Sequence, residues 1–167
     1  MKRRNNPASV SNICLPDMLE ERLPPVAGSY LLWFFLARHQ TIAIGRLGTL
    51  EFKRGWYGYC GSAYGPGGLK ARLGHHLRVA VRPHWHIDYF KAKASLRLIW
   101  LEKHAAREHL WSSLLKQLPG FSLPCPGFGA SDCACVSHLL YCPARAGLRA
   151  AAAELAAVGT LTRLRLP

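Results

Sequence analysis

The chain has 167 residues, of which 50% are hydrophobic, and its 22 lysines and arginines outnumber 9 acidic residues, so the formal net charge is +13. This length suffices for one domain with a sizeable core, and the hydrophobic content excludes a wholly disordered chain. Such a basic protein is electrostatically suited to nucleic acid or another polyanion. Because aromatic residues accompany the charge, we expect nucleic acid; a generally basic protein without that partner is the alternative.

The sequence predicts neither secretion nor a membrane partner. The charged start, residues 1–6, is not followed by an apolar segment, and the most apolar run, residues 30–37, is too short to cross a bilayer. We therefore expect a cytoplasmic protein. Its six cysteines should then be reduced, which predicts metal binding or burial rather than disulfides. The oligomeric state stays open.

The composition divides the chain into three parts. Residues 1–27 are predicted to form a basic arm and a short helix over 15–23, which two prolines end. Residues 28–142 form the main domain. Residues 143–167, which are rich in alanine, are predicted to form a C-terminal helical extension.

The first part of the main domain consists of expected strands. Residues 28–37 are apolar without polar alternation, which predicts a strand buried on both faces. Strands over 40–44 and 49–52, joined by a turn over 45–48, follow through short loops. This succession favours an antiparallel meander.

A glycine-rich stretch then joins a strand to a helix. Aromatic residues over 56–59 favour a strand, and the glycines within 61–68 can adopt backbone angles that side chains forbid. Residues 69–78 are predicted to form a helix. The stretch thus places two tyrosines at a strand end and a basic helix after a flexible loop, an arrangement suited to an anionic substrate.

The later part of the chain alternates strands and helices. A strand over 95–101 precedes a helix over 104–118. The core face of that helix is expected to contain Ala105, Leu110, Leu114 and Leu118. After a loop rich in proline and glycine, a strand over 136–141 and a helix over 144–158 complete the predicted elements.

Tyrosine, arginine and histidine residues around the glycine-rich stretch form the first candidate site. The set consists of Tyr30, either Tyr57 or Tyr59, Arg72 and His76. A tyrosine can act as a general base only if nearby cations or a metal-bound water lower its pKa well below about 10. The guanidinium of Arg72 matches phosphate oxygens. Packing of the tyrosines in the core, with their hydroxyls bonded, is the alternative.

Glu108 is the second candidate, because acidic residues are scarce and this one lies in a basic and apolar segment. A carboxylate beside phosphate-binding groups suits Mg²⁺, which prefers oxygen ligands and keeps several waters. Glu102 and Glu51 are rival candidates, and a solvated charge on a helix face is the alternative for Glu108.

Two further groups contain metal-ligating residue types. On an extended backbone, His84, His86 and Asp88 would point the same way; they could bind metal, form a turn or contact phosphate. Cys133, Cys135 and His138, with Cys125 upstream, are the ligand types of a tetrahedral structural zinc site. The two neighbouring cysteines could equally pack in a strand.

These residues together resemble a known signature. Gly28-Ser29-Tyr30 and Tyr59-Cys60-Gly61 resemble the two halves of the GIY-YIG nuclease motif. Arg72 stands in the helix after the second half, where that superfamily has its arginine, and His76 follows one helical turn later. Glu108 lies in a later helix, where the superfamily has its metal-binding glutamate.

The resemblance is closer to one uncharacterised subgroup of that superfamily, whose members are sometimes fused to DNA glycosylases of the endonuclease-III type. It extends over about residues 28–142. The pieces that carry it are Gly45-Arg-Leu-Gly48, Tyr57-Gly-Tyr-Cys-Gly-Ser-Ala63, Pro66-Gly-Gly-Leu69, His84-Trp-His-Ile-Asp-Tyr89 and Gly127-Phe-Gly-Ala-Ser-Asp-Cys-Ala-Cys-Val-Ser-His138.

The resemblance implies a fold and a reaction. The fold is a small α/β (α+β) domain with a central antiparallel sheet flanked by helices. The reaction is cleavage of a DNA phosphodiester with Mg²⁺ or Mn²⁺. Tyr59 or Tyr30 would activate the water, Arg72 would stabilise charge on the phosphate, His76 would assist, and Glu108 would hold the metal.

We therefore expect a metal-dependent DNA endonuclease, a hydrolase acting in DNA repair. The residues expected to contact DNA are Lys70, His75, Arg78, His84 and His86. The alternative is a non-catalytic accessory domain that binds nucleic acid through phosphate contacts and stacking. A structural zinc ion at the cysteines is a further, separate hypothesis.

Overall fold

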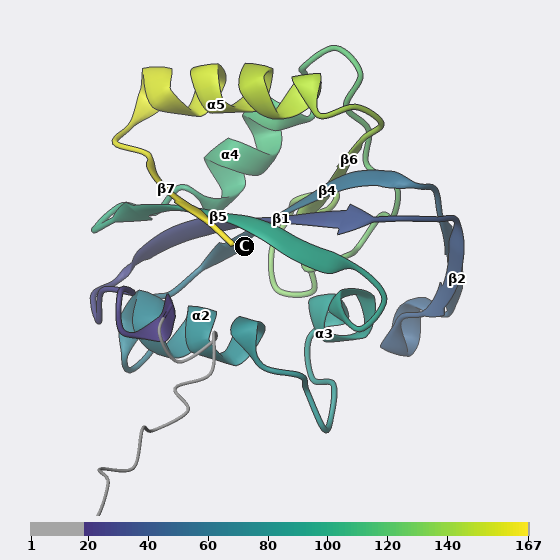
Figure 1. The fold of residues 1–167 in the computed structure, drawn as a ribbon, viewed down its shortest axis with the longest axis horizontal. Coiled ribbons are helices and arrows are strands. Elements are labelled where there is room, and N and C mark those ends of the chain that lie inside the picture. Colours follow the sequence, from purple (N-terminus) through teal and green to yellow (C-terminus); the bar gives the residue numbers. More distant parts are fainter. Residues whose placement is uncertain (1–18, 167) are drawn as a thin grey trace, which may run out of the picture.

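The chain folds around a five-stranded antiparallel sheet in the order β6-β4-β1-β5-β7 (Figure 1). A computed structural model of the protein describes residues 19–166. The strands of this sheet are β1 (Gly28–Leu36), β4 (Gly55–Ser62), β5 (Ser95–Lys103), β6 (Leu139–Cys142) and β7 (Thr162–Arg165).

Helices cover both faces of the sheet. The helices are α2 (Gly68–Leu77), α3 (His86–Lys91), α4 (Glu108–Leu115) and α5 (Ala146–Val158). Figure 1 shows α2 and α3 on one face and α4 and α5 on the other. The expected class, a small α+β domain with a central antiparallel sheet flanked by helices, is confirmed.

Strand β1 lies in the middle of the sheet, and its side chains alternate between two apolar cores. Tyr30, Leu32 and Phe34 pack with residues of α2 and α3. Leu31 and Trp33 pack with residues of α4 and α5 on the opposite face. Burial on both faces, predicted from the lack of polar alternation, is confirmed.

The predicted meander is wrong. Strands β2 (Gln40–Ala43) and β3 (Thr49–Phe52) pair only with each other and form a separate two-stranded sheet, joined by a 3₁₀ turn over Gly45–Leu47. A strand buried on both faces needs hydrogen-bonding partners along both edges. The longer strands β4 and β5 provide them for β1, whereas most residues of β2 and β3 stay partly or fully exposed.

Helix α4 differs from its prediction in length and in orientation. It begins at Glu108 rather than at 104, because β5 continues to Lys103 and His104 adopts a positive φ of 60°. Its buried side chains are Trp111, Ser112 and Leu115. The expected core residue Leu110 is 38% exposed. Neighbouring helical residues point about 100° apart, and burying the large Trp111 ring turns Leu110 outward.

The elements near the two ends of the chain also differ in part from their predictions. Strand β6 begins at Leu139 rather than at 136, and β7, which the sequence did not predict, pairs with β5. The expected N-terminal arm and the start of the helix predicted over 15–23 lie outside the described residues; Leu19 and Glu20 are helical.

None of the helices described within residues 19–166 has the length and apolar character that crossing a membrane requires.

The orientation of α4 can be tested with a matched pair of substitutions. Leu115 is fully buried, so Leu115→Ala should lower the free energy of unfolding by about 2–5 kcal/mol. The exposed Leu110 is the control, and Leu110→Ala should cost less than about 0.5 kcal/mol. Urea unfolding of both variants measures the difference, and equal losses would contradict the observed helix face.

Candidate active site

A polar pocket of about 500 Å³ lies where the ends of several elements meet. Its lining comes from β1, β4, α2, the first turn of α4, and the segments that precede α3 and β6. Four of the predicted catalytic residues line it together, namely Tyr30, Tyr59, Arg72 and Glu108. The fold thus gathers side chains that are widely separated in the sequence.

The pairing of β1 with β4 places the two tyrosines on one face of the sheet. Tyr30 lies opposite Gly61, and Tyr59 lies opposite Leu32, which shares the face of Tyr30. The ring of Tyr30 lies across Gly61, where any added Cβ would collide with it. Position 61, in the second half of the motif, therefore needs glycine, because the ring of Tyr30, from the first half, lies over it.

Tyr59, rather than Tyr57, is the second tyrosine of the pocket. Tyr57 packs between Phe52 and Phe90, and its hydroxyl donates to the carbonyl of Lys53 at 2.7 Å. Because Tyr57 and Tyr59 are two residues apart, both point to the same face, but only Tyr59 reaches the pocket.

A loop before β6 presses against Tyr59. Gly129 has a positive φ of 71°, and a Cβ at that position would lie 2.8 Å from Cε2 of Tyr59. Its amide donates to Nδ1 of His86 at 3.0 Å. Glycine at 129 therefore allows the loop to close one side of the pocket against the tyrosine ring.

Tyr30 is hydrogen-bonded to His76 of α2. The Tyr30 hydroxyl lies 2.9 Å from Nε2 of His76, and both side chains are buried. Burial, and then the nearby Lys91 and His75, lower the pKa of His76 to about 3, so the ring is neutral near pH 7. Burial also raises the pKa of Tyr30 and of Tyr59 well above their usual value. Both phenols are therefore protonated in the resting protein.

Arg72 is positioned by helix packing and by an aromatic ring. Leu69 and Leu73 anchor α2 in the core, and the Arg72 guanidinium lies 4.4 Å from the ring centroid of Trp85. This cation–π contact fixes the guanidinium without neutralising its charge. Among residues 19–166, Arg72 forms no ion pair. It is available for an anionic ligand.

Glu108 opens α4 and faces the pocket. Its Oε1 lies 2.8 Å from Nδ1 of His138. Burial alone would raise the pKa of this carboxyl, but hydrogen bonds from His138 and Ser62 outweigh that effect, so the pKa is lowered. The carboxylate is therefore ionised at neutral pH. Because an ionised carboxylate has about four acceptor positions, two hydrogen bonds leave room for a cation.

The rival glutamates lie outside this pocket. Glu102 pairs with Nε of Arg107 at 3.0 Å and accepts a hydrogen bond from the amide of Thr160. Glu51 belongs to β3 and lies 3.9 Å from Nε2 of His39 at the surface. The contacts described here account for both carboxylates, so neither of them requires a substrate as a partner.

The extended arrangement expected for His84, His86 and Asp88 is wrong, because helix α3 begins at His86. The carboxylate of Asp88 accepts hydrogen bonds from the amides of His84 and Trp85, each at 3.0 Å, and thereby caps the helix. His84 and His86 line the pocket, whereas Asp88 does not.

Asp88 instead belongs to an ionic cluster with His75 and Lys91. Nζ of Lys91 lies 2.9 Å from Oδ1 of Asp88, and Nε2 of His75 lies 3.2 Å from the same atom. His75, His76 and Asp88 are close enough to share a metal. The ammonium of Lys91 already occupies the carboxylate, which argues against a cation there.

The residues expected to contact DNA fall into two groups. His84 and His86 line the pocket. Lys70 and His75, on α2, and Arg78, directly after it, do not line the pocket, and Arg78 forms an ion pair with Glu20. Of these five residues, only the two histidines before and at the start of α3 line the pocket, while His75 packs against the ring of His76 from outside it.

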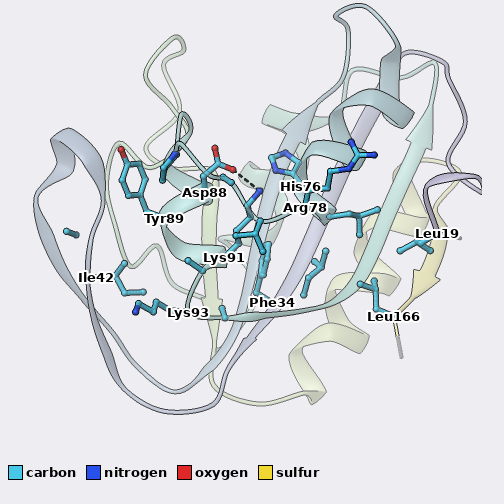
Figure 2. A pocket seen from close by; sticks show the side chains of 18 of the residues that line it. Leu19, Phe34, Ile42, His76, Arg78, Asp88, Tyr89, Lys91, Lys93 and Leu166 are labelled. Atoms are coloured by element: carbon cyan, nitrogen blue, oxygen red, sulfur yellow. Dashed lines mark ion pairs between the residues drawn. The ribbon is translucent and has the colours of Figure 1, made fainter. Parts of the chain in front are cut away.

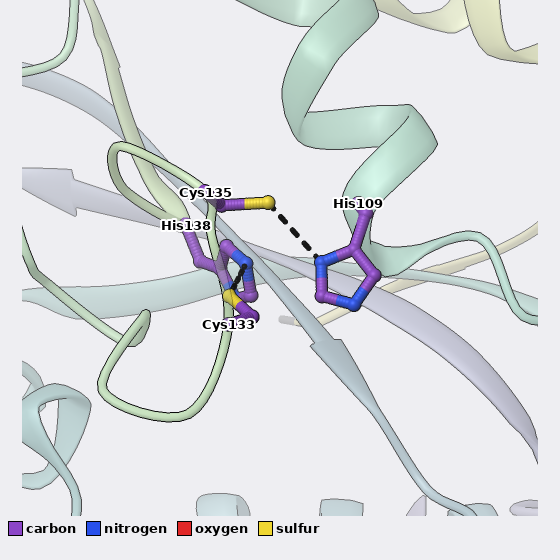
Figure 3. A group of neighbouring side chains, drawn as sticks. All are labelled: His109, Cys133, Cys135 and His138. Carbon is purple, nitrogen blue, oxygen red and sulfur yellow. Dashed lines mark hydrogen bonds between the residues drawn. The ribbon is translucent and has the colours of Figure 1, made fainter.

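Four metal-ligating side chains meet beside Glu108 (Figure 3). His109, Cys133, Cys135 and His138 have ligand atoms that all lie within 4.8 Å of one another. Three of them belong to the expected zinc set. The fourth expected ligand, Cys125, lies in the core instead, with its thiol directed at the carbonyl of Pro126.

Several lining residues were not identified from the sequence, namely Ser62, Trp85, His109, Gly129, Ser131 and Asp132. Each except His109 lies inside one of the motif pieces that carry the resemblance. Their position within those pieces could therefore have identified them as candidate site residues. His109 follows Glu108 directly, but only the packing of α4 against the loop before β6 brings it to the cysteines.

A second and larger cavity, of about 680 Å³, has a mostly apolar lining (Figure 2). It includes Leu19, Phe34, Ile42 and Leu166 and shares no lining residue with the polar pocket. Basic side chains such as Lys91 and Lys93 lie around it. Its lining also includes arginines, Tyr89 and Asp88, but Asp88 is paired with Lys91 and Arg78 with Glu20. The smaller pocket combines two tyrosines with Arg72 and Glu108, so it is the better candidate for chemistry on a phosphodiester.

The fold and the pocket define a small α+β protein whose polar pocket combines two tyrosines, an arginine and an ionised carboxylate. The chain belongs to the family described as Domain of unknown function DUF123, whose model matches residues 29–159. No curated protein and no solved structure matches the chain.

The burial of His76 predicts a pH dependence of stability. Its pKa falls from 6.5 to about 3 on folding, so the folded state binds fewer protons, and stability is lost as pH falls below 6.5. Between about pH 7 and pH 5 the parent should lose up to about 2 kcal/mol of unfolding free energy through this group.

Urea unfolding at both pH values measures this loss. His76→Gln should remove most of it while keeping a hydrogen-bonding partner for Tyr30. The control His39→Gln alters an exposed histidine and should keep the parent's pH dependence. Equal pH dependence in His76→Gln and the parent would contradict a neutral, buried His76.

Proposed function

We propose that the protein is a metal-dependent DNA endonuclease of the GIY-YIG type that hydrolyses phosphodiester bonds with Mg²⁺ or Mn²⁺. One observation carries the proposal: Tyr30, Tyr59, Arg72 and Glu108 line one polar pocket. The sequence resemblance predicts this set of residues, and the pocket supports it by bringing together side chains from four elements, β1, β4, α2 and α4. We also propose a role in DNA repair, on the resemblance alone, and a cytoplasmic setting, on the sequence pattern described above.

Activation of water falls to Tyr30 and His76 in this proposal. Because both phenols keep high pKa values, neither supplies a phenolate at rest. Tyr30 instead donates a hydrogen bond to Nε2 of His76, 2.9 Å away, which leaves its oxygen free to accept a hydrogen bond from the attacking water and to orient that water. The water oxygen attacks phosphorus as the bond to the leaving oxygen breaks, and the proton that the water loses passes to the leaving oxygen.

Charge stabilisation falls to Arg72 and Glu108. The guanidinium of Arg72, held by Trp85, offers paired N–H donors to the non-bridging oxygens. The pKa of Glu108 is lowered, and its ionised carboxylate, together with water, would hold Mg²⁺, which prefers oxygen ligands. A bound Mg²⁺ supplies positive charge to the phosphate in the transition state. Fixed charges of this kind provide much of the rate enhancement in phosphoryl chemistry.

The substrate class follows from charge and from the pocket wall. The chain carries a net charge of +13, and His84, Trp85 and His86 line the pocket. Cationic side chains favour phosphate contacts, and aromatic rings favour stacking on bases. Nucleic acid therefore fits this pocket better than a small neutral substrate.

Cleavage assays on duplex, single-stranded and branched DNA test the proposal. Arg72→Ala and Glu108→Gln should each slow cleavage by about 10²–10³-fold, because each removes a charge that acts in the transition state. Arg97→Ala, an exposed arginine on β5, and Glu154→Gln, on α5, are the matched controls and should cut at the parental rate.

The metal requirement is tested by omitting and restoring Mg²⁺ rather than by a chelator, which would also remove ions held by cysteines. Cleavage should stop without Mg²⁺ and return with it. No cleavage of any of the three substrates, or full activity of Arg72→Ala, would contradict the nuclease proposal.

A non-catalytic accessory domain is the second candidate. The raised pKa values of both tyrosines favour it, because protonated phenols bind nucleic acid but are poor bases. This function predicts DNA binding that weakens steeply with salt, with no turnover and no loss of affinity in Glu108→Gln. Binding measurements on the variants described above distinguish the two functions.

A further inference from the structure

We propose that His109, Cys133, Cys135 and His138 form a structural zinc site, and that its ligand His138 holds Glu108 in the orientation that the pocket requires. The metal site does not depend on whether the protein cleaves DNA. Only the role given to Glu108 rests on the proposed function.

The distances between the ligand atoms fit a tetrahedral ion. Nδ1 of His109 lies 3.1 Å from Sγ of Cys135, and Sγ of Cys133 lies 3.4 Å from Nε2 of His138 (Figure 3). In a tetrahedral zinc site, bond lengths near 2.3 Å to sulfur and 2.0 Å to nitrogen place such atoms about 3.5 Å apart. All four atoms lie within 4.8 Å of one another.

The chemistry of the donor set favours zinc over other divalent ions. Two thiolates and two neutral imidazoles balance the charge of Zn²⁺, and this S₂N₂ set is typical of zinc rather than of Mg²⁺ or Ca²⁺. Because the protein supplies all four positions, the site is closed. A closed tetrahedral site is structural and leaves no position for a substrate.

His138 connects this site to the pocket. Its Nε2 faces Cys133, and its Nδ1 lies 2.8 Å from Oε1 of Glu108. A zinc-bound histidine commonly gives its other N–H to a carboxylate, which fixes the ring and raises its strength as a ligand. Glu108 occupies that position here. The same contact therefore orients the imidazole for zinc and the carboxylate for the pocket.

The position of the ligands in the chain explains what the ion would stabilise. His109 lies in the first turn of α4, and Cys133, Cys135 and His138 all lie in the segment that precedes β6. Residues 116–138 form no helix or strand, which is long for a loop inside a domain. An ion at this point ties the loop to α4. The loop also carries Gly129, which contacts Tyr59.

Metal content of the full chain tests the site. Protein produced with zinc supplied and purified without chelator should contain one zinc ion per chain. Cys133→Ser and Cys135→Ser should lose it, whereas Cys125→Ala, which alters the buried cysteine outside the cluster, should retain it. Absence of zinc from the parent, or loss of zinc in Cys125→Ala alone, would overturn the proposal.

Cobalt substitution keeps the test decisive if a cysteine variant fails to fold. Co²⁺ added to chelator-treated parent and to Cys125→Ala should give the visible and near-ultraviolet absorption of tetrahedral cobalt bound by thiolates. An octahedral spectrum without thiolate absorption would rule out this ligand set. This readout does not depend on DNA cleavage.

The link to Glu108 has its own readout. Glu108→Gln should weaken zinc affinity about 10–100-fold, the usual effect of losing a carboxylate partner of a zinc-bound histidine. The control Glu154→Gln should leave zinc affinity at the parental value. Competition with a zinc-binding dye measures both. Unchanged affinity in Glu108→Gln would disprove the coupling while leaving the ligand set and the nuclease proposal to be judged by their own experiments.

Discussion

The burial of β1 on both faces is the constraint on which the rest of the structure depends. Its alternating side chains supply one core with α2 and α3 and a second core with α4 and α5. Because neither edge of a fully buried strand can rely on water, β4 and β5 must pair with it. This pairing sets Tyr30 across Gly61 and places Tyr59 on the same face. The candidate site thus results directly from the strand pairing that supplies hydrogen bonds to both edges of β1.

The low-polarity surroundings that stabilise this arrangement also determine its chemistry. Burial keeps His76 uncharged and both phenols protonated, so no group of the Tyr30–His76 pair carries charge at rest. Charge is concentrated instead on Arg72 and Glu108, which are less deeply buried than the two tyrosines. In the proposed reaction, negative charge develops on phosphate, and two fixed charges in a site with low-polarity walls suit that change.

The close contact between the carboxylate of Glu108 and Nδ1 of His138 joins two parts of the molecule that the sequence separates. On one side are the pocket and α2; on the other are His109, Cys133 and Cys135. A carboxylate fixed in this way loses little rotational freedom when it binds a cation, which favours a preorganised site. A change that loosens the loop before β6 would therefore also change the orientation of the Glu108 carboxylate. The loop itself supplies no catalytic group.

The sequence by itself determined most of the elements, the strand buried on both faces, and the tyrosine, arginine and glutamate set, because apolar continuity and the two motifs are local signals. It could not decide that β2 and β3 pair apart from β1, or that Trp111 rather than Leu110 faces the core, since both depend on competition between partners distant in the chain. The sequence also left open whether Tyr57 or Tyr59 belongs to the site. It predicted Cys125 as the fourth ligand of the metal-binding group, where the structure has His109. Only the tertiary structure decided these points, because they rest on which side chains meet once the sheet and helices have packed.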